Sequence, residues 1–531
     1  TVRAMIVSTS AGKVEGVERG GVVRFRGIPY AAPPVGRRRF RPPAPVEPWS
    51  GVRDASAFGA MAPQRVGPLE SVLGADAMAM DEDCLTLNVV TPGSHDAGRP
   101  VMVWIHGGGF TTGANAIPWY GGSRLATKGD VVVVAVNYRL GVLGFTHLAD
   151  ALGDDLAGAG NLGIADQVAA LRWVRDEIAA FGGDPDRVTV FGESAGAMSV
   201  TTLLATPAAA GLFRRAIAQS GAGHNVHEVD EAVAVRDAVV AELGASSPEV
   251  LLDAAVEDLL VAQTTVAVRA FAGDFIGQAP ARGSGILGGS ALALPFQPVV
   301  DGGALPARPL DAIGAGAAAD VALIAGTNAD EFTLFSSLIG DGSLSDADLL
   351  ARVTKAMGAA DDEAHVVVAT YRAARPDATA DDLWVAFATD WVFRIPCLRL
   401  LDAQAAHQAD TWGYRFSWPS TSFGGRLRAG HAVEIPFVFD IVDHPANALV
   451  LGHVDDGARM VAAAMSSAWL AFAHDGDPSG TTSDGTGPAI APTPTWPRWD
   501  PERRAVLDLD DPLTVVDDPA ADERALWVDR L

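Results

Sequence analysis

Four short runs of apolar residues recur along the first two thirds of the chain. The runs cover residues 101–105, 131–136, 187–191 and 321–325. They are rich in β-branched residues, and Gly or Asn follows closely, which favours strands over buried helical segments. Strands that are apolar on both faces are typical of the centre of a largely parallel sheet.

Between the second and third runs, apolar residues fall at spacings of three and four from Ile164 to Ile178. This spacing predicts a helix with one apolar face, which Gly182, Gly183 and Pro185 end. Strand, helix and strand in succession require a right-handed crossover. The pattern therefore predicts an α/β fold with a mostly parallel central sheet flanked by helices.

The rest of the chain extends this pattern without an internal repeat or an interdomain linker, so residues 1–531 are predicted to form a single domain. We expect a hairpin over residues 14–26, mainly helices over 341–410 with an acidic turn or solvated face at 361–363, an aromatic strand over 411–418, a helix over 460–473 and a surface loop over 476–496.

Charge and composition narrow the classes of partner. A net charge of −26 repels nucleic acid and anionic membranes. No apolar run approaches the ~20 residues that span a bilayer, and the 2 cysteines make no disulfide framework. The first residues carry no apolar signal core, and the chain starts with Thr1. We expect a soluble protein, cytoplasmic or secreted after loss of a leader, and its oligomeric state stays open.

One motif in the chain predicts a nucleophile. Residues 192–196 read Gly-Glu-Ser-Ala-Gly, between a predicted strand and an apolar helical segment, and this G-x-S-x-G occurs once. A strand-to-helix turn this tight strains the serine backbone and exposes its hydroxyl. The alternative, a plain glycine-rich turn, does not explain the strand and helix on either side. Ser194 is therefore the candidate nucleophile.

A serine nucleophile needs a histidine base and a carboxylate behind it, which follow in the order Ser, acid, His in α/β-hydrolases. Glu331 lies just after the predicted strand at 321–325, with Asp330 as its local competitor. From local pattern alone, either acid could equally be a surface residue. The later histidines are candidates for the base: His365, His407, His431, His444, His453 and His474. His474 directly follows an apolar helix, where the helix dipole alone favours it, so it is discounted.

Three consecutive glycines, Gly107 to Gly109, end the first apolar run. Backbone N–H groups exposed there, with that of Ala195, would hold the oxyanion of a tetrahedral intermediate. His106 precedes the serine and breaks the expected order, so we interpret it as structural.

Longer segments resemble the type-B carboxylesterase/lipase family, which includes bacterial p-nitrobenzyl esterases and cholinesterases. The matching segments are residues 25–36, 82–88, 104–110, 137–141, 160–196, 219–221, 389–396 and 431–439. The resemblance implies the α/β-hydrolase fold, with long insertions that form a gorge or cap. It implies a triad of Ser194, Glu331 and His431, and oxyanion donors Gly108, Gly109 and Ala195. It also implies a supporting shell of Glu193 and Ser220, and stabilising ion pairs Arg39–Glu82 and Arg139–Asp166.

The chain departs from this family at several points. Many relatives pair the cysteine at position 84 with one upstream, but residues 58–64 contain none, so Cys84 is expected to be a free, buried thiol. Phe332 stands where a glycine usually follows the acid, which is expected to reshape the loop behind Glu331. Residues 225–290 and 340–385, where relatives line the gorge, match poorly.

We therefore expect a carboxylic ester hydrolase that acts on small to medium neutral esters through an acyl-enzyme intermediate, without metal or organic cofactor. Two alternatives remain at this stage. One is a non-catalytic binding or adhesion protein of the same fold. The other is a hydrolase of amides, carbamates or long-chain lipid esters, which the gorge segments would decide.

Overall fold

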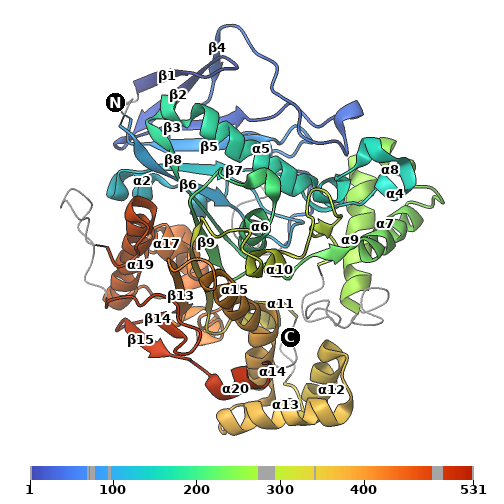
Figure 1. Ribbon diagram of the computed structural model, residues 1–531, viewed down its shortest axis with the longest axis vertical. Helices are drawn as coiled ribbons and strands as arrows, with labels where there is room; N and C mark the ends of the chain where they lie inside the picture. Colours follow the sequence, from blue (N-terminus) through green and yellow to red (C-terminus); the bar gives the residue numbers. More distant parts are fainter. Residues whose placement is uncertain are drawn as a thin grey trace.

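The computed structural model describes residues 3–67, 71, 78–93, 97–272, 294–339, 343–480 and 494–528. Among these residues, 13 strands form one large twisted sheet that runs through the molecule (Figure 1). In spatial order they are β1 (Arg3–Ser8), β2 (Lys13–Arg19), β3 (Val22–Pro29), β5 (Thr86–Thr91), β7 (Val132–Val136), β6 (Arg99–Ile105), β8 (Gly183–Glu193), β9 (Arg215–Gln219), β12 (Ala322–Asn328), β13 (Thr411–Phe416), β14 (Ala505–Leu509) and β15 (Thr514–Asp517), with β4 (Val52–Asp54) beside β2.

The middle of this sheet is parallel, from β7 through β6, β8, β9, β12 and β13 to β14. Its two ends are antiparallel except for β4, which is parallel to β2. The four apolar runs form β6, β7, β8 and β12, which confirms the predicted strands. β8 begins four residues earlier than expected, at Gly183. The predicted hairpin is also present, as β2 and β3.

Helices cover both faces of the sheet, and successive strand residues enter two separate apolar clusters. Val103 packs with α5 (Leu162–Glu177) and α6 (Ala195–Leu204), whereas Trp104 packs on the other face with α19 (Asp456–Asp475). Each central strand is therefore apolar on both sides, because both sides are covered.

The predicted helix at 164–178 is α5, and η6 (Ile178–Phe181) continues it to Gly182, whose φ of 85° ends the helix. The late helix is α19, and the aromatic strand is β13. In the loop expected over 476–496, residues 477–480 and 494–496 form no helix or strand, and residues 481–493 lie outside the described residues.

A helical region lies at one end of the molecule and has its own apolar cluster (Figure 1). It contains α11 (Phe332–Ile339), α12 (Asp346–Met357), α13 (Asp361–Ala374), α14 (Ala380–Thr389) and the π-helix η8 (Asp390–Arg394), which continues into α15 (Ile395–Ala405). The acidic segment at 361–363 is the first turn of α13, where the helix dipole favours negative side chains.

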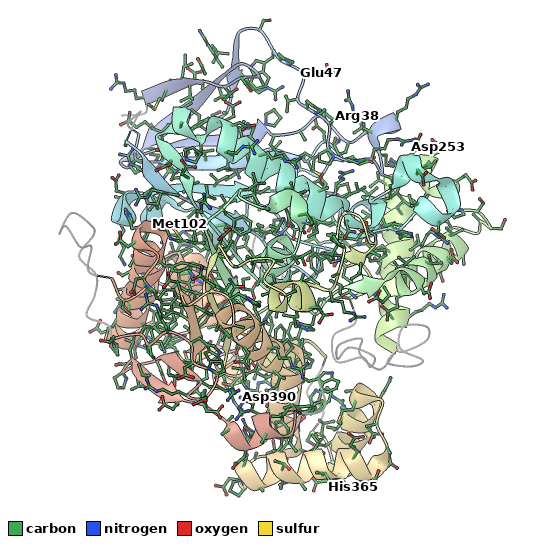
Figure 2. All side chains as sticks on the ribbon, viewed as in Figure 1. Arg38, Glu47, Met102, Asp253, His365 and Asp390 are labelled. Carbon is green, nitrogen blue, oxygen red and sulfur yellow. The ribbon has the colours of Figure 1, made fainter. Side chains whose placement is uncertain are left out.

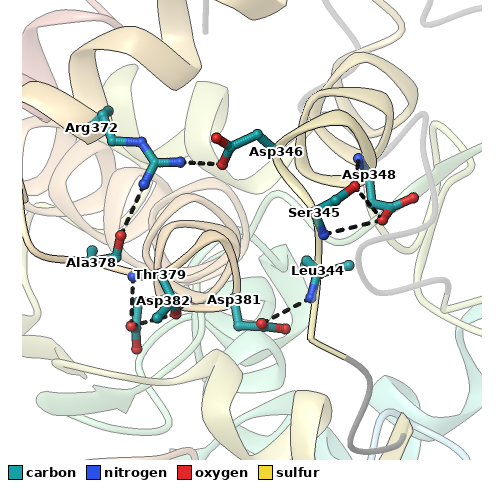
Figure 3. A network of polar contacts seen from close by, with 9 residues as sticks. All are labelled: Leu344, Ser345, Asp346, Asp348, Arg372, Ala378, Thr379, Asp381 and Asp382. Atoms are coloured by element: carbon teal, nitrogen blue, oxygen red, sulfur yellow. Dashed lines mark hydrogen bonds and ion pairs between the residues drawn. The ribbon is translucent and has the colours of Figure 1, made fainter.

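Polar caps order this region. Ser345 and Asp348 exchange hydrogen bonds at the start of α12, and Thr379 and Asp382 do the same at the start of α14 (Figure 3). Arg372 joins the two starts by donating to Asp346 and to the Ala378 carbonyl. Each such cap stabilises its helix by about 1 kcal/mol.

Asp390, at the junction of this region with the body, ties several elements together (Figure 2). Its carboxylate accepts from the Tyr371 hydroxyl at 2.6 Å and from the Arg394 guanidinium at 2.5 and 2.8 Å. Trp527 donates to the same tyrosine at 3.2 Å, so the segment around Trp527 is fixed to the region as well.

The remaining described elements are short or peripheral. They are α2 (Ser123–Gly129), α3 (Gly141–Gly144), α4 (Ala149–Leu152), α7 (Val229–Glu242), α8 (Val250–Asp253), α9 (Val256–Ala272), α10 (Pro309–Gly314), α16 (Ser422–Gly425), α17 (Ile435–Val438), α18 (Ala448–Leu451), α20 (Ala521–Ala525), β10 (His227–Glu228), β11 (Val299–Val300), η1 (Gly36–Arg38), η3 (Pro118–Tyr120), η4 (Asp154–Leu156), η5 (Ala159–Asn161), η7 (Pro207–Ala209) and η9 (Pro445–Asn447). Within the described ranges, every helix is too short or too polar to cross a membrane.

Both cysteines are free, as expected for Cys84. Burial raises the pKa of both thiols, that of Cys397 to about 12, so neither is a reactive thiolate at neutral pH.

Candidate active site

Ser194 lies in a strained turn between β8 and α6. Its φ of 57° and ψ of −126° are rarely adopted by residues other than glycine. Gly196 makes the turn possible, because a Cβ there would lie 2.1 Å from the carbonyl oxygen of Ile105 in β6. The Ser194 N–H donates to the Gln219 carbonyl at 2.9 Å, which fixes the turn against β9. The serine itself is partly exposed, so a substrate can reach it.

The glycine loop after β6 packs directly against this turn. A Cβ at Gly107 would lie 3.0 Å from the Cβ of Ser194. The Gly108 carbonyl accepts from the N–H groups of Thr111 and Thr112, at 3.0 and 2.9 Å, and this holds the loop. In the described part of the chain, the N–H groups of Gly108, Gly109 and Ala195 donate to no protein acceptor. Unpaired donors next to a candidate nucleophile are what an oxyanion hole requires.

His431 and Glu331 form a buried pair. The loop that follows β12 carries Glu331, and the loop between α16 and α17 carries His431, whose Nδ1 lies 2.6 Å from Glu331 Oε2. The other carboxylate oxygen accepts from the Asn328 N–H at 2.7 Å, and neither side chain is appreciably exposed. The carboxylate therefore orients the ring, with the proton on Nδ1 and Nε2 free to act as a base.

Aromatic rings enclose this histidine. The ring of Phe335 in α11 is 5.1 Å from the His431 ring between centroids, and that of Phe393 in η8 is 4.8 Å away. Phe332 is buried against Phe335 and Trp384, and its N–H donates to a side chain of α14. The residue that departs from the family pattern thus starts α11 and anchors it in the helical region, while Glu331 still contacts His431.

Two further carboxylates surround His431. Glu193 Oε1 lies 3.1 Å from His431 Nε2 without hydrogen-bond alignment, and each of these two atoms is buried without a hydrogen-bond partner. Glu434 accepts from Asn328 Nδ2 at 2.7 Å and from Gln219 Nε2 at 3.3 Å. Glu434 thus reaches the pair through Asn328.

Burial and mutual charge shift the protons of this cluster. Burial raises the pKa of Glu193 to about 8, and burial together with the charge of Glu331 raises that of Glu434 to about 7. Burial lowers the pKa of His431, but Glu193, Glu331 and Glu434 outweigh it and raise that pKa to about 9. The surrounding carboxylates therefore stabilise the imidazolium, the form that His431 reaches when it accepts a proton as a base.

The structure brings Ser194, Glu193, His431 and Glu331 together, beside the glycine loop. In the conformation described, Ser194 Oγ forms no hydrogen bond with His431 among the described residues. Such bonds are often long in enzymes without substrate. Ser220 is buried at the end of β9, with a φ of 54°, its N–H donates to the Gly326 carbonyl at 2.8 Å, and its hydroxyl has no partner.

The competing residues lie in other surroundings. Asp330 faces Arg428 at 3.8 Å. The ring of His106 stacks on Tyr138, with centroids 4.5 Å apart, and lies 2.9 Å from the Gly107 carbonyl, which supports its structural interpretation. His474 lies 2.7 Å from the Gly129 carbonyl.

Sequence reasoning missed Glu434, Asn328 and Gln219 as members of the site. Gln219 and Glu434 lie in segments that resemble the family, Gln219 next to Ser220 and Glu434 three residues after His431. This proximity to predicted site residues was the signal available in the sequence. Among the described residues, no group of three or more His, Cys, Asp or Glu is arranged to hold a metal ion.

The chain is similar to known proteins over nearly its whole length. The model of the carboxylesterase family matches residues 3–527. The para-nitrobenzyl esterase of Bacillus subtilis (strain 168) is 38% identical over 524 residues, which cover 98% of this chain and 97% of the relative. The phenmedipham hydrolase of Pseudarthrobacter oxydans is 37% identical and 95% of each chain is covered. The crystal structure of a Geobacillus stearothermophilus carboxylesterase at pH 6.2 is similar with a TM-score of 0.83 and 39% identity, covering 98% of this chain and 99% of that one.

Proposed function

Because the chain belongs to the carboxylesterase family, we propose that Ser194 is its nucleophile, His431 its general base and Glu331 the acid that orients the base. The chain is a carboxylic ester hydrolase with the α/β-hydrolase fold, so the predicted fold and enzyme class are confirmed. We extend the proposal to the whole chain, residues 1–531, acting as one domain.

The observation that carries the proposal is the buried 2.6 Å contact between His431 and Glu331, next to the strained turn of Ser194. A carboxylate on Nδ1 stabilises the imidazolium that forms when the base takes a proton. A surface histidine in a structural role does not need such a partner.

The reaction proceeds in two steps. His431 Nε2 accepts the hydroxyl proton while Ser194 Oγ attacks the ester carbonyl, and the same proton then passes to the departing alcohol. For this, the serine hydroxyl has to rotate toward Nε2, the atom that Glu193 faces in the described conformation. Water activated by His431 then cleaves the acyl-enzyme and releases the acid.

The oxyanion of each tetrahedral intermediate is proposed to accept from Gly108, Gly109 and Ala195. These three N–H groups donate to no acceptor among the described residues. A hydrogen bond to the oxyanion would therefore not replace a hydrogen bond within the protein. Each such donor contributes roughly 10²–10³ in rate. Glu193 and Ser220 are proposed to support the triad without taking part in bond making.

We propose neutral esters of small to medium size as substrates. The chain carries a net charge of −26, which repels an ester with an anionic acyl group.

The test measures hydrolysis of p-nitrophenyl esters from acetate to palmitate by wild type, Ser194→Ala and His431→Gln, with His474→Gln as the matched control. We expect both site variants to lose roughly 10⁴-fold or more in kcat while folded, and the control to keep wild-type activity. A fully active Ser194→Ala would overturn the assignment of the nucleophile.

A further inference from the structure

A cavity of about 270 Å³ lies on the face of the sheet over β3, β5 and β7, and Ser194 is not among the residues that line it. Its floor consists of alternate residues of these adjacent strands, among them Arg24 and Arg26 of β3, Asn88 of β5 and Val133 of β7. The segment 115–121 and the start of α2 form its other wall.

The charges in this cavity are unbalanced. Two arginines line it, no Asp or Glu does, and neither arginine forms an ion pair with a described acid. By contrast, Arg39 and Arg394, elsewhere in this acidic chain, each have a carboxylate partner. Burial and the mutual repulsion of Arg24 and Arg26 lower the pKa of Arg26, so the pair gains from any anion between them.

The two guanidinium groups are held by hydrogen bonds that do not use all of their N–H donors. Arg24 donates through Nε and Nη2 to the Ser123 hydroxyl and through Nη1 to the Arg19 carbonyl. Arg26 donates only through Nη1, to the Ser56 carbonyl at 3.3 Å, and its guanidinium carbon lies 4.3 Å from the ring centroid of Phe58. Stacking fixes the plane of Arg26, and its Nε–Nη2 edge has no partner among the described residues. That edge matches a carboxylate in the bidentate geometry.

Asn88, Asn115, Tyr120 and Ser123 add polar groups to the lining, and the remaining lining residues are mostly apolar. Val90, Ile117, Pro118, Val133 and Ala135 face the same space, and Phe58 stands at its rim with 44% of its surface exposed. The volume is close to the lower end of the roughly 300–1,000 Å³ that ligand pockets span.

We propose that this cavity binds a small monocarboxylate with an apolar body, whose carboxylate sits on Arg26 and Arg24 and whose body packs between Val133 and Ile117. Ester hydrolysis releases carboxylates of this class, so the reaction itself produces candidate ligands for the cavity. The inference rests on the cavity and does not depend on the assignment of the triad.

Calorimetric titration of benzoate tests the proposal, with benzyl alcohol and inorganic phosphate as comparison ligands for wild type. We expect benzoate to bind and both comparison ligands to bind at least ten-fold more weakly, because one lacks the charge and the other the apolar body. Equal binding of benzyl alcohol or of phosphate would overturn the assignment of the ligand.

Variants locate the binding. Arg26→Gln should weaken benzoate binding ten-fold or more. Arg26→Lys should weaken it less, because lysine keeps the positive charge but cannot form the bidentate pair of hydrogen bonds. Arg53→Gln is the matched control, since Arg53 stacks on Trp49 in the same way, with 4.5 Å to the ring centroid, but lies outside the cavity. Ester turnover by each variant reports folding. If benzoate binds Arg26→Gln as tightly as wild type, it sits elsewhere, as a product in the active site would, and the proposal is wrong.

Discussion

Two buried charged sites in this molecule differ in how their charges are matched. Asp166 accepts from Arg139 three times, through N, Nε and Nη2 at 3.0, 2.8 and 2.7 Å, and the remaining Nη1 donates to the Arg41 carbonyl at 2.8 Å. One positive charge meets one negative charge, and each guanidinium nitrogen donates a hydrogen bond. Such a site can hold its shape but has no proton to give.

Around His431, by contrast, three carboxylates face one imidazole, and the closest approach to Nε2 is not a hydrogen bond. Burial, and to a smaller extent the neighbouring carboxylates, raise the pKa values of Glu193 and Glu434, and the carboxylates raise the pKa of His431 against the effect of burial. Balanced charge thus serves the fold and unbalanced charge serves proton transfer. Each of the following changes tests that distinction.

The largest effect is expected from Glu331→Gln. The amide cannot stabilise the imidazolium and favours the wrong tautomer of His431, so kcat should fall roughly 10³–10⁴-fold. The melting temperature should change little. Steady-state kinetics on p-nitrophenyl acetate measures the loss, and Asp330→Asn is the neighbouring control that keeps activity. Equal losses in the two variants would contradict the role of Glu331.

Arg139→Met should affect stability instead of catalysis. It leaves Asp166 buried without its partner, which costs about 3–5 kcal/mol in the free energy of unfolding. Urea denaturation measures this cost. Turnover per active site, counted by titration with a serine-directed phosphonate, should match wild type. A loss of turnover in fully folded protein would place Arg139 in the catalytic machinery.

Glu434→Gln should change how stability depends on pH. The pKa of Glu434 in the folded protein is about 7, raised from 4.5. Because the folded-state value is the higher one, wild type loses stability as pH rises from about 4.5 to about 7, whereas glutamine stays neutral. Relative to wild type, the variant should therefore gain on the order of 2–3 kcal/mol between pH 4.5 and pH 8. Parallel stability curves would show that Glu434 carries no extra proton.

The smallest effect concerns Glu193→Gln. The pKa of His431 is raised to about 9, with Glu193 the first carboxylate responsible, and the base works only when neutral. Removing the charge should move the acid limb of the kcat/KM profile down by about one pH unit. A limb that stays in place would mean that Glu193 does not act on His431 through its charge.

The sequence carried different amounts of information on different parts of the molecule. Local pattern identified the central strands and α5, because burial on both faces gives a strand a continuous apolar run, and burial on one face gives a helix apolar residues at spacings of three and four. It also identified Ser194, whose turn needs glycines at fixed distances. His431 could be selected among six later histidines only by resemblance, since its partner lies 100 residues away. Glu434 was missed because hydrogen bonds across 106 and 215 residues bring it to the site.

The position of His431 between two aromatic rings has a practical consequence. Its ring is flanked by Phe335 and Phe393, which belong to the helical region with the third apolar cluster and not to the sheet. Regions of one protein open at different free energies, so loosening of those helices alone would displace the rings beside His431 and lower activity while the sheet stays folded. An engineer who wants a longer working lifetime in a warm reactor could therefore test substitutions that stabilise α11 and η8.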